Sequence, residues 1–379
     1  MSRLIVPVLV AALVVGIAPA SASDDVGFDD VGVAARAGQW QLAALRLPEA
    51  WRSSRGEGVL VAVLDTGVNG RHPDLRGAVI EGPDLTGAAK GLWGRHGTAM
   101  AGLIAGRGHG DERRGGVIGV APAAKVLSIR VTLENGDPLR VQQRSRGHDA
   151  LARGIRYAAD HGADVISMSL GGGSGAWEGS ALEEEAVRYA IAKGAVLVAS
   201  SGNDGASANR KNFPAAYPGV IAVGAVDRSL NVARFSNRQD YLSVVAPGAE
   251  IVTADGDDSY VVSDGTSSAA AMVAGIAALI KAAHPDMSPY DVRMAIELGT
   301  RRRPSDGYSR AYGHGVADAL LALREAALLD VPAPPLPRPG PHLGDVPSPA
   351  SRGPVVGGML LIMAAMSAHV IARHRRRRT

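Results

Sequence analysis

The sequence predicts an α/β domain in three layers, with a mainly parallel, twisted sheet covered by helices on both faces. Short runs rich in Val, Ile and Ala alternate along the chain with segments of helical periodicity. Strands that are apolar on both sides belong in the middle of a parallel sheet. The 379 residues include 48 Gly but only 3 Phe, which favours close backbone packing over disorder.

The elements follow in order along the chain. The first strand is expected at 59–64, where six apolar residues follow one another. Helical spacing at 149–161 and 182–193 predicts helices that end at Gly162 and Gly194. In such sheets, functional groups gather where strands end and helices begin. The further strands are expected at 125–131, 165–170, 195–200 and 220–226.

The first 22 residues have the layout of a secretory signal peptide. Arg3 supplies the positive start, 4–17 the apolar stretch, and Ala20-Ser21-Ala22 the small-residue cleavage pattern. A retained N-terminal anchor is the alternative. Residues 23–50 would then form a short N-terminal extension. We therefore expect an exported protein.

A second apolar run, at 355–372, predicts a membrane-spanning helix. Its 18 residues are near the lower limit for a span, and the five Arg residues within 373–379 are a stop-transfer signal on the cytoplasmic side. A buried hydrophobic helix is the alternative. The many prolines of 331–354 predict an extended linker. We therefore expect a single-pass protein of the cell membrane, with a domain at 51–330 outside the cytoplasm and its C-terminus inside.

Several function classes are excluded or disfavoured. The absence of Cys excludes disulfides, zinc-thiolate sites and cysteine nucleophiles. The formal net charge of +3 falls to −2 without the five tail arginines, so nucleic acid is not an expected partner. The glycines of 106–110 do not match a nucleotide-binding loop. Asp255, Asp257 and Asp258 look like a solvated turn, so neither a metal nor another cofactor is expected.

Three polar residues lie at a strand end or a helix start, where functional groups gather in such a domain. Asp65 ends the first strand, although an Asp there also serves as a turn or capping residue. His96 opens a small-residue helix, where a single His is commonly structural. Ser267 begins another such helix; Ser is a usual cap there, yet the helix dipole also favours developing negative charge. Together they supply the nucleophile, base and orienting carboxylate of acyl transfer.

The motifs around these residues resemble the subtilisin family of serine proteases, in that family's order. Asp65-Thr66-Gly67, His96-Gly97-Thr98 and Gly265-Thr266-Ser267 resemble its three catalytic motifs. The resemblance covers about residues 50–325 and implies the subtilisin fold and cleavage of polypeptide substrates. Further matching segments are 167–172, 201–205, 217–225 and 312–315.

The resemblance also implies a role for each residue. Ser267 would be the nucleophile, His96 the general base and acid, and Asp65 the group that orients the imidazole. Asn203 would donate to the oxyanion together with the backbone N–H of Ser267. The substrate-binding residues that the resemblance implies, by pairing with an extended peptide, are Ser169, Leu170 and Gly171.

The order of the segments resembles the mycosins, the membrane-anchored subtilisins of actinobacterial type VII secretion systems. Residues 39–51 also resemble the mycosin N-terminus. The extension at 23–50 is shorter than an inhibitory prodomain of the family would be, so we expect a protein that is active without the removal of a large segment. Ala271 stands where the family usually has Pro, and this chain lacks the cysteine pairs of many mycosins. The resemblance implies a type VII secretion membrane complex as partner. The alternatives are an assembly component with little-used protease activity, and a general surface protease unrelated to secretion.

Overall fold

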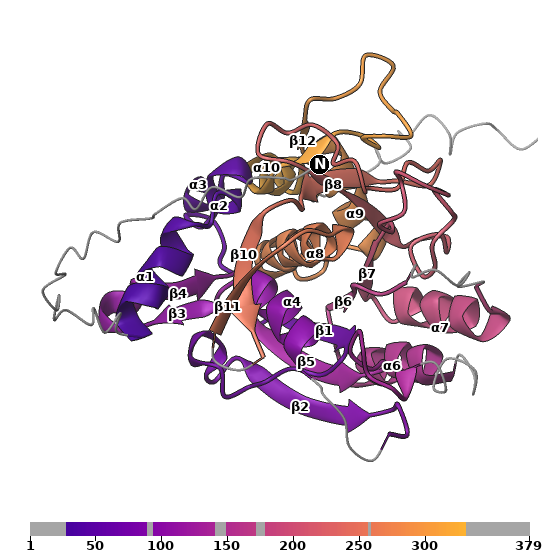
Figure 1. Cartoon of the computed structure of the whole chain (residues 1–379). Coiled ribbons are helices and arrows are strands. Elements are labelled where there is room, and N and C mark those ends of the chain that lie inside the picture. The colour runs from indigo at the N-terminus through magenta and orange to yellow at the C-terminus, as the bar shows by residue number, and fades with distance from the viewer. Residues whose placement is uncertain (1–27, 89–93, 141–148, 172–178, 257–258, 331–379) are drawn as a thin grey trace, which may run out of the picture. The chain divides into compact units, whose positions relative to one another are not determined.

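The computed structural model describes residues 28–88, 94–140, 149–171, 179–256 and 259–330. The predicted signal peptide, linker, membrane helix and basic tail lie outside the described residues. In the described part, a nine-stranded sheet lies between two layers of helices (Figure 1). The strands follow in the order β12 (Thr300–Arg301), β13 (Val316–Ala317), β9 (Val244–Pro247), β8 (Ile221–Val226), β7 (Val196–Ser200), β6 (Val165–Met168), β1 (Leu60–Asp65), β5 (Lys125–Arg130) and β2 (Val79–Asp84).

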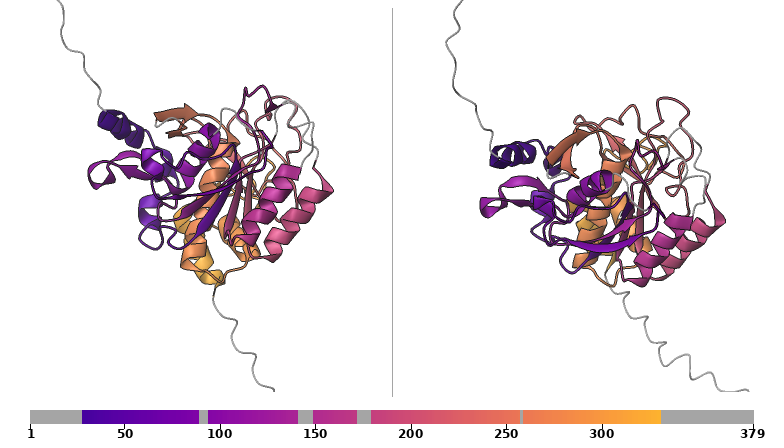
Figure 2. Two further views of the ribbon diagram at one scale, coloured as in Figure 1. Left: turned by 90° about the horizontal axis from the view of Figure 1, so that it is seen from below. Right: turned by 60° about the horizontal axis from the view of Figure 1, so that its bottom comes forward.

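The sheet is parallel throughout except for the short edge pair β12–β13. Side chains that alternate along β1 enter two separate cores: Val63 packs on one face and Leu64 on the other. Figure 2 shows the helices on both sides of the sheet. One core is covered by α4 (Arg95–Ala105) and α8 (Thr266–Ala283), the other by α6 (Asp149–Asp160) and α7 (Ala181–Ala192).

The expected three-layer α/β fold is thus confirmed. All five expected strands and both expected helices are present, with ends within two residues of the expected ones. Helices cover both faces of each central strand. Nearly every side chain of these strands is therefore buried, which explains why their apolar runs are uninterrupted.

Helix α8 passes through the core. In the part of the chain that the structure describes, it alone is long and apolar enough to cross a membrane, but 83% of it is buried inside the protein. Its small residues allow this burial. A Cβ at Gly275 would come within 2.5 Å of Val120 Cβ, so only Gly permits this approach.

Helix α3 (Leu47–Ala50) and the turn before it pack against the C-terminal helix α10 (Ala319–Leu329). The backbone N–H of Ala319 donates to Leu45 O at 3.1 Å, and Arg46 Nε donates to Asp318 Oδ2 at 2.6 Å. The sequence predicted an extension here without assigning helices to it. The other helices at the two ends of the described domain are α1 (Phe28–Ala37), α2 (Gln41–Ala44) and α9 (Pro289–Leu298).

Two antiparallel ribbons were not expected from the sequence. Helix α1 lies against the first of them, the β3–β4 pair (Figure 1). The second, β10–β11, borders the cleft that is described below. Their bounds, with those of two short 3₁₀ helices, are β3 (Arg107–His109), β4 (Gly115–Ile118), β10 (Ile251–Asp255), β11 (Ser259–Ser263), η1 (Pro73–Leu75) and η2 (Asp111–Arg113).

A buried carboxylate fastens the β3–β4 ribbon. Asp74 is fully buried; its Oδ1 accepts a hydrogen bond from His109 Nδ1 at 2.6 Å and its Oδ2 accepts one from Val117 N at 2.8 Å. Arg36 of α1 donates from Nε to Gly116 O at 2.8 Å. The ribbon and the N-terminal helix are therefore joined to η1 by polar contacts rather than by an extended apolar core.

Candidate active site

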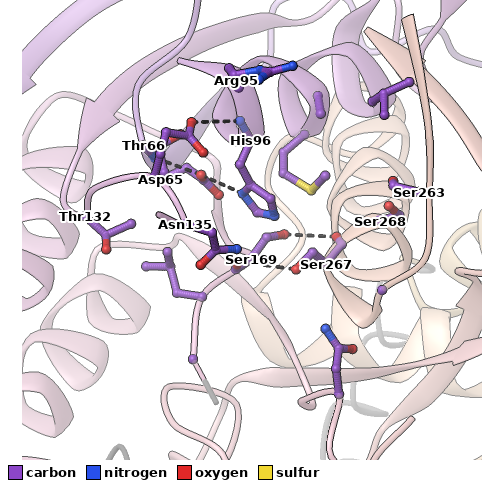
Figure 3. A pocket seen from close by; sticks show the side chains of 18 of the residues that line it. Asp65, Thr66, Arg95, His96, Thr132, Asn135, Ser169, Ser263, Ser267 and Ser268 are labelled. Atoms are coloured by element: carbon purple, nitrogen blue, oxygen red, sulfur yellow. Dashed lines mark hydrogen bonds and ion pairs between the residues drawn. The ribbon is translucent and has the colours of Figure 1, made fainter. Parts of the chain in front are cut away.

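A cleft of about 660 Å³ opens at the carboxyl end of β1 (Figure 3). Asp65 is the last residue of β1, His96 lies in the first turn of α4, and Ser267 lies in the first turn of α8. The structure thus brings together the side chains that the sequence placed 31 to 202 positions apart. All seven predicted site residues line this cleft: Asp65, His96, Ser169, Leu170, Gly171, Asn203 and Ser267.

Asp65 holds the imidazole of His96. His96 Nδ1 donates to Asp65 Oδ1 at 2.7 Å, and the same oxygen accepts the backbone N–H of Thr66 at 2.7 Å. Asp65 is fully buried, and its Oδ2 has no hydrogen-bond partner among the described residues. Because Nδ1 is the donor, the lone pair of the neutral ring is on Nε2, where it can accept a proton.

The charges around His96 favour its protonated form. Burial acts to lower the pKa of His96, but the charge and hydrogen bond of Asp65, and then the charge of Glu134, act to raise it. Arg140 opposes them, and the net effect is a pKa above the ordinary value. Glu134 Oε1 also accepts the backbone N–H of His96 at 3.0 Å. The sequence did not reveal Glu134, because it contacts the start of α4 from a distant segment and lies in no recognisable motif.

Ser267 does not act as a helix cap. The N-cap of α8 is Gly265, which has no side chain, and the first backbone N–H of the helix, that of Thr266, donates to Asn203 Oδ1. Ser267 Oγ instead donates to Ser169 O at 3.4 Å, and Ser169 Oγ donates to Ser267 O at 2.9 Å. Ser267 and His96 make no hydrogen bond in this structure, and such bonds commonly form only when a substrate is bound. The neighbouring Ser268 is 2% exposed and therefore a poor candidate nucleophile.

Asn203 points an amide donor into the cleft. Its Oδ1 accepts from both the backbone N–H and the hydroxyl of Thr266, each at 2.9 Å. These two bonds fix the orientation of the amide. They leave Nδ2, which has no partner among the described residues, beside the start of α8. A donor placed there can stabilise an oxyanion that forms on an acyl group attached to Ser267.

Charged residues form the rim on the other side of the cleft. Arg95 donates from Nε to Asp255 Oδ1 at 3.0 Å and from Nη2 to Oδ2 at 2.7 Å. The hydrogen bond from Arg95 is the main cause that lowers the pKa of Asp255. Asp255 therefore does not belong to a solvated turn: it ends β10 and is 9% exposed. Asp257 and Asp258 lie outside the described residues, and no His, Asp or Glu cluster in the described ranges could hold a metal ion.

Comparison with known sequences shows which family this chain resembles. Residues 56–315 match the Peptidase S8 model of the subtilase family. The chain is 39% identical to thermitase from Thermoactinomyces vulgaris over 67% of this chain and 85% of thermitase. It is 36% identical to fervidolysin from Fervidobacterium pennivorans over 75% of this chain but only 43% of fervidolysin, so it spans less than half of that protein.

The fold is also similar to that of a solved mycosin. The structure described as the serine protease MycP1, an essential component of the type VII (ESX-1) secretion system, superposes with a TM-score of 0.64. The two chains are 31% identical, and the match covers 78% of this chain and 90% of that one. With a family match over most of its described domain and serine proteases as relatives, the chain is a subtilisin-like serine protease and belongs to the subtilase family.

Proposed function

We propose that this chain is an endopeptidase that cleaves polypeptides through an acyl-enzyme on Ser267. The observation that carries the proposal is the 2.7 Å hydrogen bond between His96 Nδ1 and the buried Asp65, in the same cleft as Ser267 and Asn203. Nucleophile, base, orienting carboxylate and oxyanion donor are the parts that acyl transfer requires.

The proposed reaction uses each part in turn. An extended peptide pairs with residues 169–171, which follow β6 and line the cleft. Ser267 Oγ attacks the peptide carbonyl while His96 Nε2 takes its proton, and Asp65 stabilises the imidazolium. Asn203 Nδ2 and the Ser267 N–H donate to the oxyanion. His96 then gives the proton to the leaving amine, and water hydrolyses the acyl-enzyme by the same steps.

We further propose that the protease is of the mycosin type, anchored in the cell membrane with its catalytic domain outside the cytoplasm. The likeness to MycP1 supports an association with a type VII secretion complex. The predicted signal at 1–22 and membrane helix at 355–372 support the topology. Helices α1–α3 contribute no residue to the lining of the cleft, which supports activity without removal of the N-terminal extension.

Labelling with a fluorophosphonate tests the nucleophile. The full chain should be labelled in detergent, and Ser267→Ala should lose the label and peptide hydrolysis while it keeps the thermal stability of the parent. Ser268→Ala is the matched control and should stay labelled. Loss of the label in Ser268→Ala with retention in Ser267→Ala would reverse the assignment. A labelled but unprocessed full chain would support activity without maturation.

Protease treatment of intact spheroplasts tests the topology. The catalytic domain should be digested, and a tag placed after Thr379 should be protected. Digestion of the tag with protection of the domain would contradict the proposed orientation. A strain that secretes normally with Ser267→Ala but not without the protein would favour the assembly role over substrate processing.

A further inference from the structure

A second cavity lies near the amino ends of β1 and β5, whereas the cleft lies at the carboxyl end of β1. It has a volume of about 460 Å³. Its wall includes Ala123, whose backbone N–H donates to Arg55 O at 2.9 Å just before β5 begins. The cleft lies at the other end of β1, six residues or roughly 20 Å away. The cavity is lined by Arg36, Arg55, Arg107, Glu112, Arg113, Ile118, Pro122 and Ala123. We call it the arginine pocket.

The arginine pocket carries an excess of positive charge. Four guanidinium groups face one carboxylate, and that carboxylate, Glu112, forms an ion pair with Arg114, which does not line the pocket. Two of the arginines are held by backbone carbonyls: Arg36 Nε donates to Gly116 O at 2.8 Å, and Arg107 Nη2 donates to Ala124 O at 3.3 Å. Carbonyls position a guanidinium but do not neutralise its charge. The carboxylate of Asp74 partly offsets the charge of Arg36.

One arginine that lines this pocket has a donor without an acceptor. Arg107 Nε is buried and makes no hydrogen bond with any described residue. Burial, and then the nearby charge of Arg113, lower the pKa of Arg107, so this guanidinium is held in an unfavourable environment. Buried donors are nearly always satisfied in folded proteins, because an unpaired one destabilises the fold. Because this Nε is shielded from solvent, an anion in the pocket would not contact it directly. It would instead offset the repulsion between the arginines, which the effect of Arg113 on Arg107 reveals.

We propose that the arginine pocket binds a phosphate group. The planar guanidinium fork of Arg matches the spacing of phosphate oxygens and donates two parallel hydrogen bonds to them. The cavity is large enough for a phosphate and part of the group attached to it. The phosphate can come from the headgroup of an anionic phospholipid or from a soluble phosphate compound.

The end of the described domain favours the lipid source. Ser54, next to Arg55, donates from Oγ to Leu279 O at 2.8 Å near the end of α8. His284, which follows α8, pairs through Nδ1 with Asp330 Oδ2 at 2.7 Å. Asp330, the last described residue, therefore lies at the same end of the domain as the arginine pocket. This preference for a lipid rests on the membrane anchoring proposed above; the phosphate site itself does not.

Calorimetric titration of the full chain in a neutral detergent tests the proposal. The two probes are inorganic pyrophosphate and monomeric dihexanoyl phosphatidylglycerol, with dihexanoyl phosphatidylcholine as the zwitterionic control. The double variant Arg107→Gln/Arg113→Gln should bind the preferred anionic probe at least about tenfold more weakly, because charge-assisted hydrogen bonds are lost. Arg153→Gln, an exposed arginine on α6, is the matched control and should bind as the parent does.

A third variant guards against misfolding of the double variant. Glu112→Gln removes the one carboxylate of the pocket, so it should bind the anionic probe more tightly than the parent does. Tighter binding of phosphatidylglycerol than of pyrophosphate identifies a lipid headgroup, and the reverse order identifies a soluble phosphate. Binding of neither anionic probe overturns the proposal. So does equal binding by the parent, the double variant and Glu112→Gln. Peptide hydrolysis by the same samples shows separately whether the proposed catalytic function holds.

Discussion

Within its described residues, the chain contains two buried aspartates that each accept a hydrogen bond from the Nδ1 of a histidine. Asp65 accepts from His96 at 2.7 Å, and Asp74 accepts from His109 at 2.6 Å. Both carboxylates are fully buried. By residue type, distance and burial of the carboxylate, the two pairs are nearly equivalent, yet only the first lies in the cleft.

The surroundings of the two pairs differ. Both oxygens of Asp74 accept an N–H, one from His109 and one from Val117, within a cluster that joins η1 to the β3–β4 ribbon. Oδ1 of Asp65 accepts two N–H groups and Oδ2 accepts none. His96 lines the same cleft as Ser267 and the amide donor of Asn203. An Asp–His hydrogen bond is therefore not by itself a mark of catalysis; a nearby hydroxyl and oxyanion donor are needed.

The largest expected effect follows from Asp65→Asn. Asn can keep the oxygen that accepts from His96 and Thr66 and place its NH₂ where Oδ2 has no partner, so the fold should be retained. The imidazolium loses its counter-charge, and the ring takes the wrong tautomer wherever the amide NH₂ turns towards it, so kcat should fall by up to roughly 10⁴-fold. Peptide hydrolysis and thermal unfolding should be measured on the same samples. Activity within tenfold of the parent would refute a catalytic role for Asp65.

Asn203→Ala should give the next largest effect. It removes the amide donor and leaves the Asp65–His96 pair in place, so kcat should fall by roughly 10²–10³-fold, the range known for an oxyanion-hole asparagine of subtilisin. KM should change little, because the oxyanion forms only in the transition state. Fluorophosphonate labelling should be slower but still directed to Ser267. A change confined to KM would argue that Asn203 binds substrate only.

Asp74→Asn is the matched change in the second pair. Here an NH₂ group must replace one of two oxygens that each accept an N–H, so a donor then faces a donor. Unfolding in urea should show a loss of about 1–3 kcal/mol, while kcat stays near that of the parent. A large loss of activity without a loss of stability would show that the two pairs are not functionally distinct.

Glu134→Gln should have the smallest effect, a shift of the pH profile. Gln can still accept the backbone N–H of His96 but lacks the charge that helps to raise the pKa of His96. The protonated ring becomes less favourable, so the acidic limb of kcat/KM should move to lower pH. Arg140→Gln removes an opposing charge and should move the limb to higher pH. Limbs that stay in place in both variants would show that these charges do not control His96.

The sequence predicted the central fold and the members of the cleft because each was encoded locally. The apolar run before Asp65 and the small-residue helix around Ser267 were visible in windows of about ten residues. The roles of these residues stay predictions until the variants are tested. The linker, membrane helix and basic tail predicted from residue 331 onwards also stay predictions, since they lie outside the described residues.

The features that the sequence did not reveal depend on distant residues. Asp74 and His109 are separated by 35 positions, and no motif joins them. The four arginines of the arginine pocket come from α1, the loop before β1, β3 and η2, and the near-neutral net charge of the domain hides their local excess. Glu134 meets His96 only through the packing of two segments. Long-range contacts of this kind produce no periodic pattern in the sequence, so they could not be predicted from it.

The contact between α3 and the C-terminal helix α10 has a mechanical consequence. Helix α10 packs on α3, α8 and α9, and the ion pair between Arg46 and Asp318 lies at its start. A pulling force applied at Asp330 would therefore act first on α10 and on the His284–Asp330 pair, and would reach Ser267 only through the whole length of α8, about 27 Å. Under tension the C-terminal helix should detach at a lower force than the core unfolds, which leaves the cleft undisturbed.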